Sequence, residues 1–384
     1  MNDSALLPRL EISIDALLHN CAALRTLLPA SVGLLAVVKD RAYGCGSKQI
    51  ALALERFGGV SFFAVNAPAE AFYLREQGVK SDILILGPAD LHALRQGSST
   101  GMVFTLTGLD DIYRWQSAEI PVRFHCNIDT RMHRLGVLPH EVEKIIAVLR
   151  QAPHLRLEGM FTHLADADDP FSKTVPEQIR LFSSCRELFI AQGLTPRHMH
   201  YANSSGILHF SPAGCTLARP GITLYGSRPD PRRPAMVDLK PVVSLKSSVV
   251  KITRVPAGTP VSYGGRYITD RDTHIAAIAL GYGCGYPRSL TNRGTLIIKG
   301  KPYTIAGTVT MDYCMVDAGP VPSIAAGDEV VAIGTQGGET ITPDDIAMLD
   351  GTIAYEILCG LSPSMERTYV MNGNIHARET GYIY

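Results

Sequence analysis

The stretch "GLLAVVKDRAYGCGSKQIALALERFG" at residues 33–58 decides the fold of this protein. It opens with a short apolar run, which is typical of a buried strand. Its last part, residues 47–58, has the pattern of a helix that ends at glycine. Lys39 and the loop that follows it lie between the two. The stretch therefore predicts one strand–loop–helix unit of an α/β fold.

The same alternation continues from about residue 30 to residue 225. Further strands are predicted at 61–66, 82–88, 122–129, 155–164 and 197–204, and helices at 67–78, 141–152 and 175–193. Alternating strands and helices imply a parallel sheet with helical crossovers. Their number approaches what a closed (β/α)8 TIM-type barrel requires. An open, doubly wound sheet is the alternative.

The pattern changes near "GSRPDPRRPAMVDLKP" at residues 226–241, which is rich in proline and charge and predicts a linker. Short β-rich runs separated by glycine and proline turns follow, as in a mostly antiparallel β domain. One helix is predicted at 352–361. We therefore expect a barrel domain at 1–232 and a C-terminal β domain at 233–384.

Composition excludes several classes of protein. The 384 residues include 36 Lys+Arg and 36 Asp+Glu, so no basic excess points to nucleic acid. No apolar stretch reaches the roughly 20 residues of a membrane span. The 8 cysteines include no CxxC pair, so a zinc ribbon is not expected and no metal is predicted. Scattered free thiols indicate a reducing compartment, the cytoplasm.

Lys39 comes directly after the apolar run, at the C-terminal end of a predicted barrel strand. Barrel active sites are built at that end. A lysine there can form a Schiff base with a carbonyl cofactor, whereas the alternative is a solvated surface charge. Tyr43 and Gly44 follow in the same loop, where a phenol can donate to a phosphate and glycine allows close approach.

Two later loops are candidates for phosphate binding. Asn203 and Ser204 belong to "YANSSG", and Arg219, Gly221 and Ile222 belong to "LARPGITLYG". Late loops of such a barrel often hold a phosphate, and exposed backbone amides bind anions. Each could also be an ordinary loop.

Other candidates lie on further loops. His163 ends the strand in "FTHLADAD", and Arg131 and Arg134 belong to "NIDTRMHRLG". Arginine suits bidentate binding of a carboxylate, although at least one of the two is expected to be a surface residue.

In the second domain, "VSYGGRY" holds Tyr263, and "GTVTMDY" holds Met311 and Asp312. A tyrosine there usually serves packing. To act as an acid–base it would need its pKa lowered by nearby positive charge.

Taken together, these stretches resemble the alanine racemase family, pyridoxal-phosphate enzymes of fold type III. The resemblance runs in order through "AVVKDRAYGCG", "IDTRMHRLG", "GMFTHLADAD", "HYANSSGIL", "LARPGITLYG", "VSYGGRY", "LGYGCGYPR", "TVTMD" and "TIAYEILCGL". It implies a (β/α)8 barrel, a C-terminal β domain and a head-to-tail homodimer. The partner's second domain would complete each active site.

The resemblance also assigns roles. Lys39 matches the lysine that holds pyridoxal 5'-phosphate and acts as one catalytic base, and Tyr263 matches the second base, supplied by the other subunit. The matching cofactor binders are Tyr43, Asn203, Ser204, Arg219, Gly221, Ile222 and Tyr355. Arg219 faces the pyridine nitrogen in the family, and His163 links it to the catalytic tyrosine.

The substrate side is assigned in the same way. Arg134 and the backbone N–H of Met311 match contacts to the substrate carboxylate, with Asp312 beside them and Tyr282 at the entrance. Asn127 stands where the family commonly has a carbamylated lysine, which leaves room for an anion such as chloride beside Arg134. Asp40 and Arg41 replace the usual Ala-Asn after the reactive lysine.

The implied reaction is interconversion of L- and D-alanine by two bases on opposite faces, supplying D-alanine for cell-wall peptidoglycan. Serine racemases share much of the pattern but tend to carry asparagine where Tyr355 lies, so a serine or broader amino-acid racemase is one alternative. A non-catalytic pyridoxal-phosphate protein is another.

Overall fold

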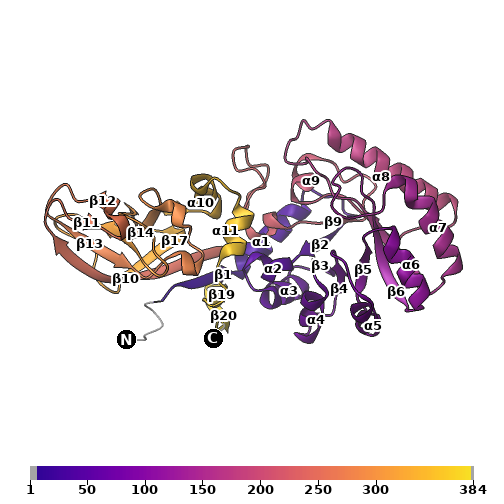
Figure 1. Ribbon diagram of the computed structural model, residues 1–384, viewed down its shortest axis with the longest axis horizontal. Coiled ribbons are helices and arrows are strands. Elements are labelled where there is room, and N and C mark those ends of the chain that lie inside the picture. The colour runs from indigo at the N-terminus through magenta and orange to yellow at the C-terminus, as the bar shows by residue number, and fades with distance from the viewer. Residues whose placement is uncertain (1–6, 382–384) are drawn as a thin grey trace.

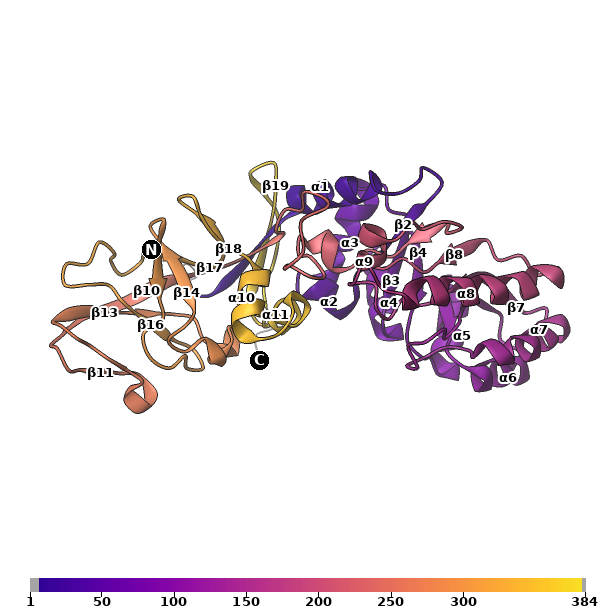
Figure 2. The ribbon, with the colours of Figure 1, turned by 90° about the horizontal axis from the view of Figure 1, so that it is seen from above.

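A computed structural model describes residues 7–381. Two bodies lie side by side along its long axis, as Figures 1 and 2 show: a barrel of strands and helices, and a smaller β-rich body. Helices α10 (Pro343–Asp350) and α11 (Ala354–Gly360) lie between them in both views.

The barrel is a sheet of eight parallel strands in the order β8-β7-β6-β5-β4-β3-β2-β9. The strands are β2 (Gly33–Val37), β3 (Phe62–Val65), β4 (Asp82–Ile85), β5 (Val103–Leu106), β6 (Val122–Asn127), β7 (Leu155–Phe161), β8 (His198–His200) and β9 (Leu217–Ala218). A parallel bridge between Asn203 and Arg219, just beyond β8 and β9, closes the ring. The predicted (β/α)8 barrel is therefore confirmed, and the open sheet is wrong.

Helices surround these strands because each has one apolar face. They are α1 (Ile14–Arg25), α3 (Ser47–Arg56), α4 (Pro68–Glu76), α5 (Leu91–Thr100), α6 (Leu109–Ala118), α7 (Val142–Gln151), α8 (Thr174–Ala191) and α9 (Ser204–His209). In α7, for example, Val142, Ile145 and Leu149 are buried and recur at helical spacing.

The second body is a mostly antiparallel sheet, as predicted. Its strands are β10 (Val243–Val255), β13 (Thr273–Ile278), β14 (Thr295–Ile298), β15 (Lys301–Thr304), β16 (Cys314–Asp317), β17 (Glu329–Gln336), β18 (Glu339–Ile341), β19 (Glu366–Met371) and β20 (Asn374–Glu379). A separate ribbon of β11 (Pro260–Val261) and β12 (Tyr267–Ile268) lies at the end farthest from the barrel (Figure 1).

The first strand of the chain belongs to the second sheet rather than to the barrel. Strand β1 (Arg9–Ser13) pairs antiparallel with β10 and parallel with β19. From β1 in the second sheet, the chain thus crosses to the barrel through α1 and returns through the linker. Asn20 of α1 is fully buried and makes two hydrogen bonds to the backbone of Lys240 in that linker and one to the backbone of Leu224 just before it.

Within residues 7–381, no helix combines the length and apolar character needed to cross a bilayer. No group of three or more His, Cys, Asp or Glu side chains in that range could hold a metal ion.

Candidate active site

A cavity of about 390 Å³ opens at the C-terminal ends of the barrel strands. Lys39 follows β2, His163 follows β7 and Arg219 follows β9, so three distant segments meet there because parallel strands end at one edge. The predicted site residues that line this cavity are Lys39, Tyr43, Asn127, Arg134, His163, Asn203, Ser204, Arg219, Gly221, Ile222 and Tyr355.

Lys39 begins an unusual segment, α2 (Lys39–Tyr43). The four residues from Asp40 to Tyr43 all have left-handed backbone, with φ of 52°, 56°, 52° and 54°. Left-handed backbone costs an L-residue about 1–2 kcal/mol, and such strain clusters at functional sites. The Lys39 side chain is 35% exposed, and its Nζ lies 3.9 Å from a carboxylate oxygen of Asp40.

The cavity has hydroxyl and amide donors at one end. The backbone N–H of Gly221 donates to Ser204 Oγ (2.9 Å), and Asn203 caps α9 by accepting from Gly206 N–H (2.8 Å). The buried Tyr43 hydroxyl has no hydrogen-bond partner within residues 7–381. A Cβ on Gly221 would come within 2.4 Å of that hydroxyl, so the absence of a side chain keeps this end open.

Arg219 lies in the wall of the cavity at the head of a buried polar chain. Its guanidinium donates to His200 Nδ1 (2.7 Å), and His200 Nε2 lies 2.8 Å from His125 Nδ1. A guanidinium can only donate, so His200 must carry its proton on Nε2 and pass a hydrogen bond to His125. Burial lowers the pKa of Arg219 to about 10, which still leaves it charged at neutral pH.

His163 sits beside Arg219, whose Nη2 lies 3.4 Å from His163 Nδ1. Burial lowers the pKa of His163 to about 3, and the positive charges of Arg219, Arg134 and Lys39 add to the effect. His163 is therefore neutral, and it can relay a hydrogen bond without carrying charge.

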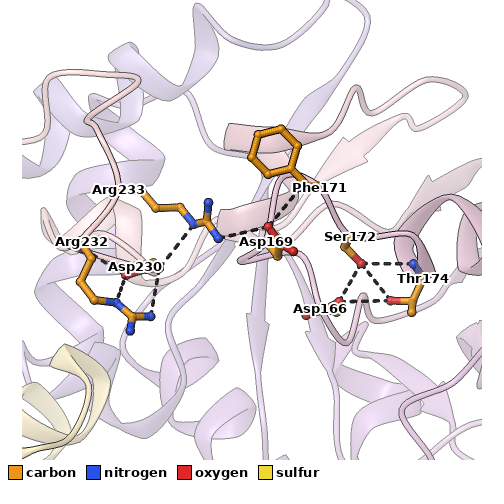
Figure 3. Close-up of polar contacts among 8 residues, drawn as sticks. All are labelled: Asp166, Asp169, Phe171, Ser172, Thr174, Asp230, Arg232 and Arg233. Carbon is orange, nitrogen blue, oxygen red and sulfur yellow. Dashed lines mark hydrogen bonds and ion pairs between the residues drawn. The ribbon is translucent and has the colours of Figure 1, made fainter.

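The loop that carries His163 is held on two sides. The buried Gln178 of α8 donates to the carbonyl of His163 (3.1 Å) and accepts from Ala165 N–H (3.0 Å). Figure 3 shows the rest of the loop: Ser172 donates to Asp166 (2.7 Å), and Arg233 of the linker donates to Asp169 (3.1 Å). Hydrogen bonds thus hold the loop to helix α8 of the barrel and to the linker.

The loop after β6 presents Arg134. Asn127 donates to the Leu135 carbonyl (2.8 Å), and Asp129 accepts from the N–H groups of Arg131 and His133 (3.0 Å each). Arg134 lines the cavity and Arg131 does not. This fits the expectation that at least one of the two arginines is a surface residue.

Four predicted residues lie outside the cavity, on the second body: Tyr263, Tyr282, Met311 and Asp312. They are exposed, Tyr263 by 75% and Met311 by 56%. Their loops are linked, because Thr308 donates to the Tyr263 carbonyl (2.8 Å) and the N–H of Gly283 donates to the Met311 carbonyl (2.8 Å). One chain therefore presents these residues as a second group, which we call the second-domain group.

Family models match the chain over both bodies. The N-terminal domain of alanine racemase matches residues 12–229, and its C-terminal domain matches residues 242–369. The chain belongs to the alanine racemase family. The resemblance drawn from the nine sequence segments is confirmed.

Individual relatives agree with the family models. An alanine racemase of Citrifermentans bemidjiense is 39% identical over 365 residues, covering 92% of this chain and 95% of the relative. Solved alanine racemases are similar throughout. That of Clostridium difficile has a TM-score of 0.91 at 29% identity over 98% of this chain and 99% of that one. That of Bacillus anthracis, with bound L-Ala-P, has a TM-score of 0.90 at 30% identity over 97% of both.

Enzymes of the alanine racemase family depend on pyridoxal phosphate. The cavity fits that group on three points. It holds an amine at Lys39 for a carbonyl and the unpartnered hydroxyl of Tyr43 for a phosphate. It also holds Arg219, whose Nε–H has no hydrogen-bond partner within residues 7–381 and can donate to a ring nitrogen.

Sequence reasoning did not single out four polar residues that support the site: Glu70, His125, Gln178 and His200. The two histidines carried only a weak signal, because each lies inside a predicted strand but both strands also contain other polar residues. Glu70 and Gln178 lie on helix faces that look ordinary in sequence.

Proposed function

We propose that this chain racemises alanine with pyridoxal phosphate bound in the barrel cavity, Lys39 holding the cofactor and Tyr263 of a second copy completing the site. The carrying observation is the cavity itself, which joins Lys39, the buried Arg219 and the open end at Gly221 in a chain of this family. The expected substrate is a small amino acid.

When bound, the cofactor withdraws electrons from the substrate's Cα and so makes its proton removable. Inversion requires that one base remove this proton from one face and another return a proton to the opposite face. The Lys39 amine serves one face and the Tyr263 hydroxyl serves the other, so their roles exchange with the direction of the reaction.

Other residues orient the substrate and set the protonation state of the cofactor. Arg134, with the Met311 N–H of the second copy and Asp312 beside it, holds the substrate carboxylate, and Tyr282 guards the entrance. Arg219 would donate to the ring nitrogen of the cofactor and, being a poor acid, would leave that nitrogen unprotonated. The neutral His163, 3.4 Å from Arg219, would connect it with Tyr263 of the second copy.

A head-to-tail homodimer is part of the proposal. The second-domain group is exposed and absent from its own chain's cavity, so a second base has to come from another copy. We also propose a cytoplasmic setting, where D-alanine would feed peptidoglycan synthesis. All eight cysteines are free and six are buried, which suits a reducing compartment.

Subunit mixing tests this arrangement. Lys39→Ala and Tyr263→Phe should each abolish deuterium incorporation at Cα when L-alanine is incubated in D2O. After the two variants are unfolded and refolded together at equal concentration, activity should return to about one quarter of wild type. Half of the dimers then hold one variant of each kind, and each of these has one intact site. No recovery, with mixed dimers present, would contradict the shared site.

A panel of L-amino acids compared by kcat/KM decides the substrate range. Higher kcat/KM for serine than for alanine would favour the serine alternative. Bound cofactor without turnover of any amino acid would favour the non-catalytic one.

A further inference from the structure

Glu70, the third residue of α4, touches the segment that carries Lys39. Its Oε1 accepts a hydrogen bond from the backbone N–H of Asp40 at 2.6 Å. Its Oε2 accepts from the N–H groups of Asn66 (2.8 Å) and Ala67 (2.9 Å). One carboxylate therefore joins the loop after β2 to the loop after β3.

The hydrogen bond from Asp40 N–H to Glu70 lies directly beside Lys39. The N–H of Asp40 belongs to the peptide bond between Lys39 and Asp40. Asp40 is also the first residue of the left-handed run. Left-handed backbone persists in L-residues only where the surroundings over-determine it. A charge-assisted hydrogen bond at the start of the run supplies such a restraint.

The far end of the run has its own restraint. The buried Arg367 of β19 donates to the carbonyl of Gly44 (2.9 Å), and Gly44 itself takes φ of 82°. Between these ends, Gly44 N–H donates to the Asp40 carbonyl (3.1 Å). Side chains from other elements thus hold the segment at both ends. Glu70 binds the N–H of Asp40, next to Lys39, and Arg367 binds the carbonyl of Gly44, five residues after Lys39.

We propose that Glu70 is a positioning residue for Lys39. It fixes the Lys39–Asp40 peptide in its left-handed conformation, and so aims the amine at the cofactor carbon and then at the substrate's Cα. This inference rests on the proposed function of Lys39. Glu70 thus has two roles. It caps helix α4 by accepting from Ala67 N–H, and it positions Lys39 by accepting from Asp40 N–H.

The test compares Glu70→Ala and the isosteric Glu70→Gln with two controls. Asp90→Ala removes the cap of the neighbouring helix α5, where Asp90 accepts from Ala93 N–H (2.8 Å), without touching the Lys39 segment. Glu76→Gln changes an exposed carboxylate on α4 itself. Only the Glu70 changes affect the backbone beside Lys39.

Two quantities are measured on the full-length protein. We expect kcat for alanine to fall about 100-fold in Glu70→Ala, the scale of a 1 Å misplacement, with little change in KM. In Glu70→Gln, kcat should fall about 10-fold, since the one remaining oxygen is a weaker, neutral acceptor and the NH2 group cannot accept from the backbone N–H groups on its side. Asp90→Ala should lower the melting temperature and leave kcat unchanged.

The second quantity is the rate at which pyridoxal phosphate labels Lys39 in cofactor-free protein. Borohydride reduces the imine between the cofactor and the lysine to a stable amine, and the mass of the labelled peptide identifies the modified lysine. Labelling should be slower in both Glu70 variants than in the controls. Wild-type kcat and labelling in a folded Glu70→Ala, or in Glu70→Gln should the former not fold, would overturn the inference. A wild-type protein without racemase activity would instead refute the proposed function, while the labelling comparison would still decide the role of Glu70.

Discussion

Three neutral histidines, two in the barrel core and one in the wall of the cavity, should make this protein sensitive to mild acid. Burial lowers the pKa of His125 and His200 well below the ordinary value, and lowers that of His163 to about 3. In the unfolded chain all three have a pKa of about 6.5. Below pH 6.5 the unfolded state binds more protons, so stability falls with pH until the folded-state pKa is reached. At pH 5 each histidine costs ~2 kcal/mol, or ~6 kcal/mol for the three.

The difference between variants isolates this effect from other titrating groups. His125→Asn keeps an oxygen near the position of Nδ1 to accept from His200, and it removes one proton-binding site. Urea unfolding at pH 7.5 and pH 5.0 should show a stability loss ~2 kcal/mol smaller than in wild type. An identical loss in His125→Asn and wild type would refute the assignment of His125 as a buried neutral group.

Three further outcomes follow from single contacts. Gly221→Ala should weaken pyridoxal-phosphate binding about 10-fold or more in an absorbance titration, since its Cβ would meet the Tyr43 hydroxyl at 2.4 Å. Asn20→Ala should lower the free energy of unfolding by about 3 kcal/mol in urea, because three hydrogen bonds are lost, two to Lys240 of the linker and one to Leu224 before it. Burial raises the pKa of Asp344 to about 6. Asp344→Asn should therefore raise the melting temperature at pH 8, and this gain should vanish by pH 4, where the native carboxyl is already protonated.

The barrel and the position of its site could be predicted because both follow from local patterns. Apolar strands and amphipathic helices alternate along the chain, and the ends of parallel strands meet at one edge. Lys39, His163 and Arg219 each follow a strand, so their meeting in one cavity needed no three-dimensional information. Their chemical roles came from the family resemblance and remain predictions, as does the division at residue 232.

Other features depend on contacts that sequence patterns do not encode. The left-handed run after Lys39 is supported by a carboxylate 30 positions later in the chain. The pairing of His125 with His200 requires that β6 and β8 both direct a polar side chain into the barrel interior. The choice of Arg134 over Arg131 depends on how one short loop folds around Asp129.

The placement of β1 has a consequence for how the chain is made. Its Glu11 pairs with Lys246, which the ribosome adds 235 positions later. At 5–20 residues per second, β1 waits ~10–50 s for this part of β10 to be made, and longer for its other neighbour, β19. During that time both edges of β1 lack their partner strands, so the second sheet can be completed only after all barrel strands, the last of which ends at Ala218, have been made.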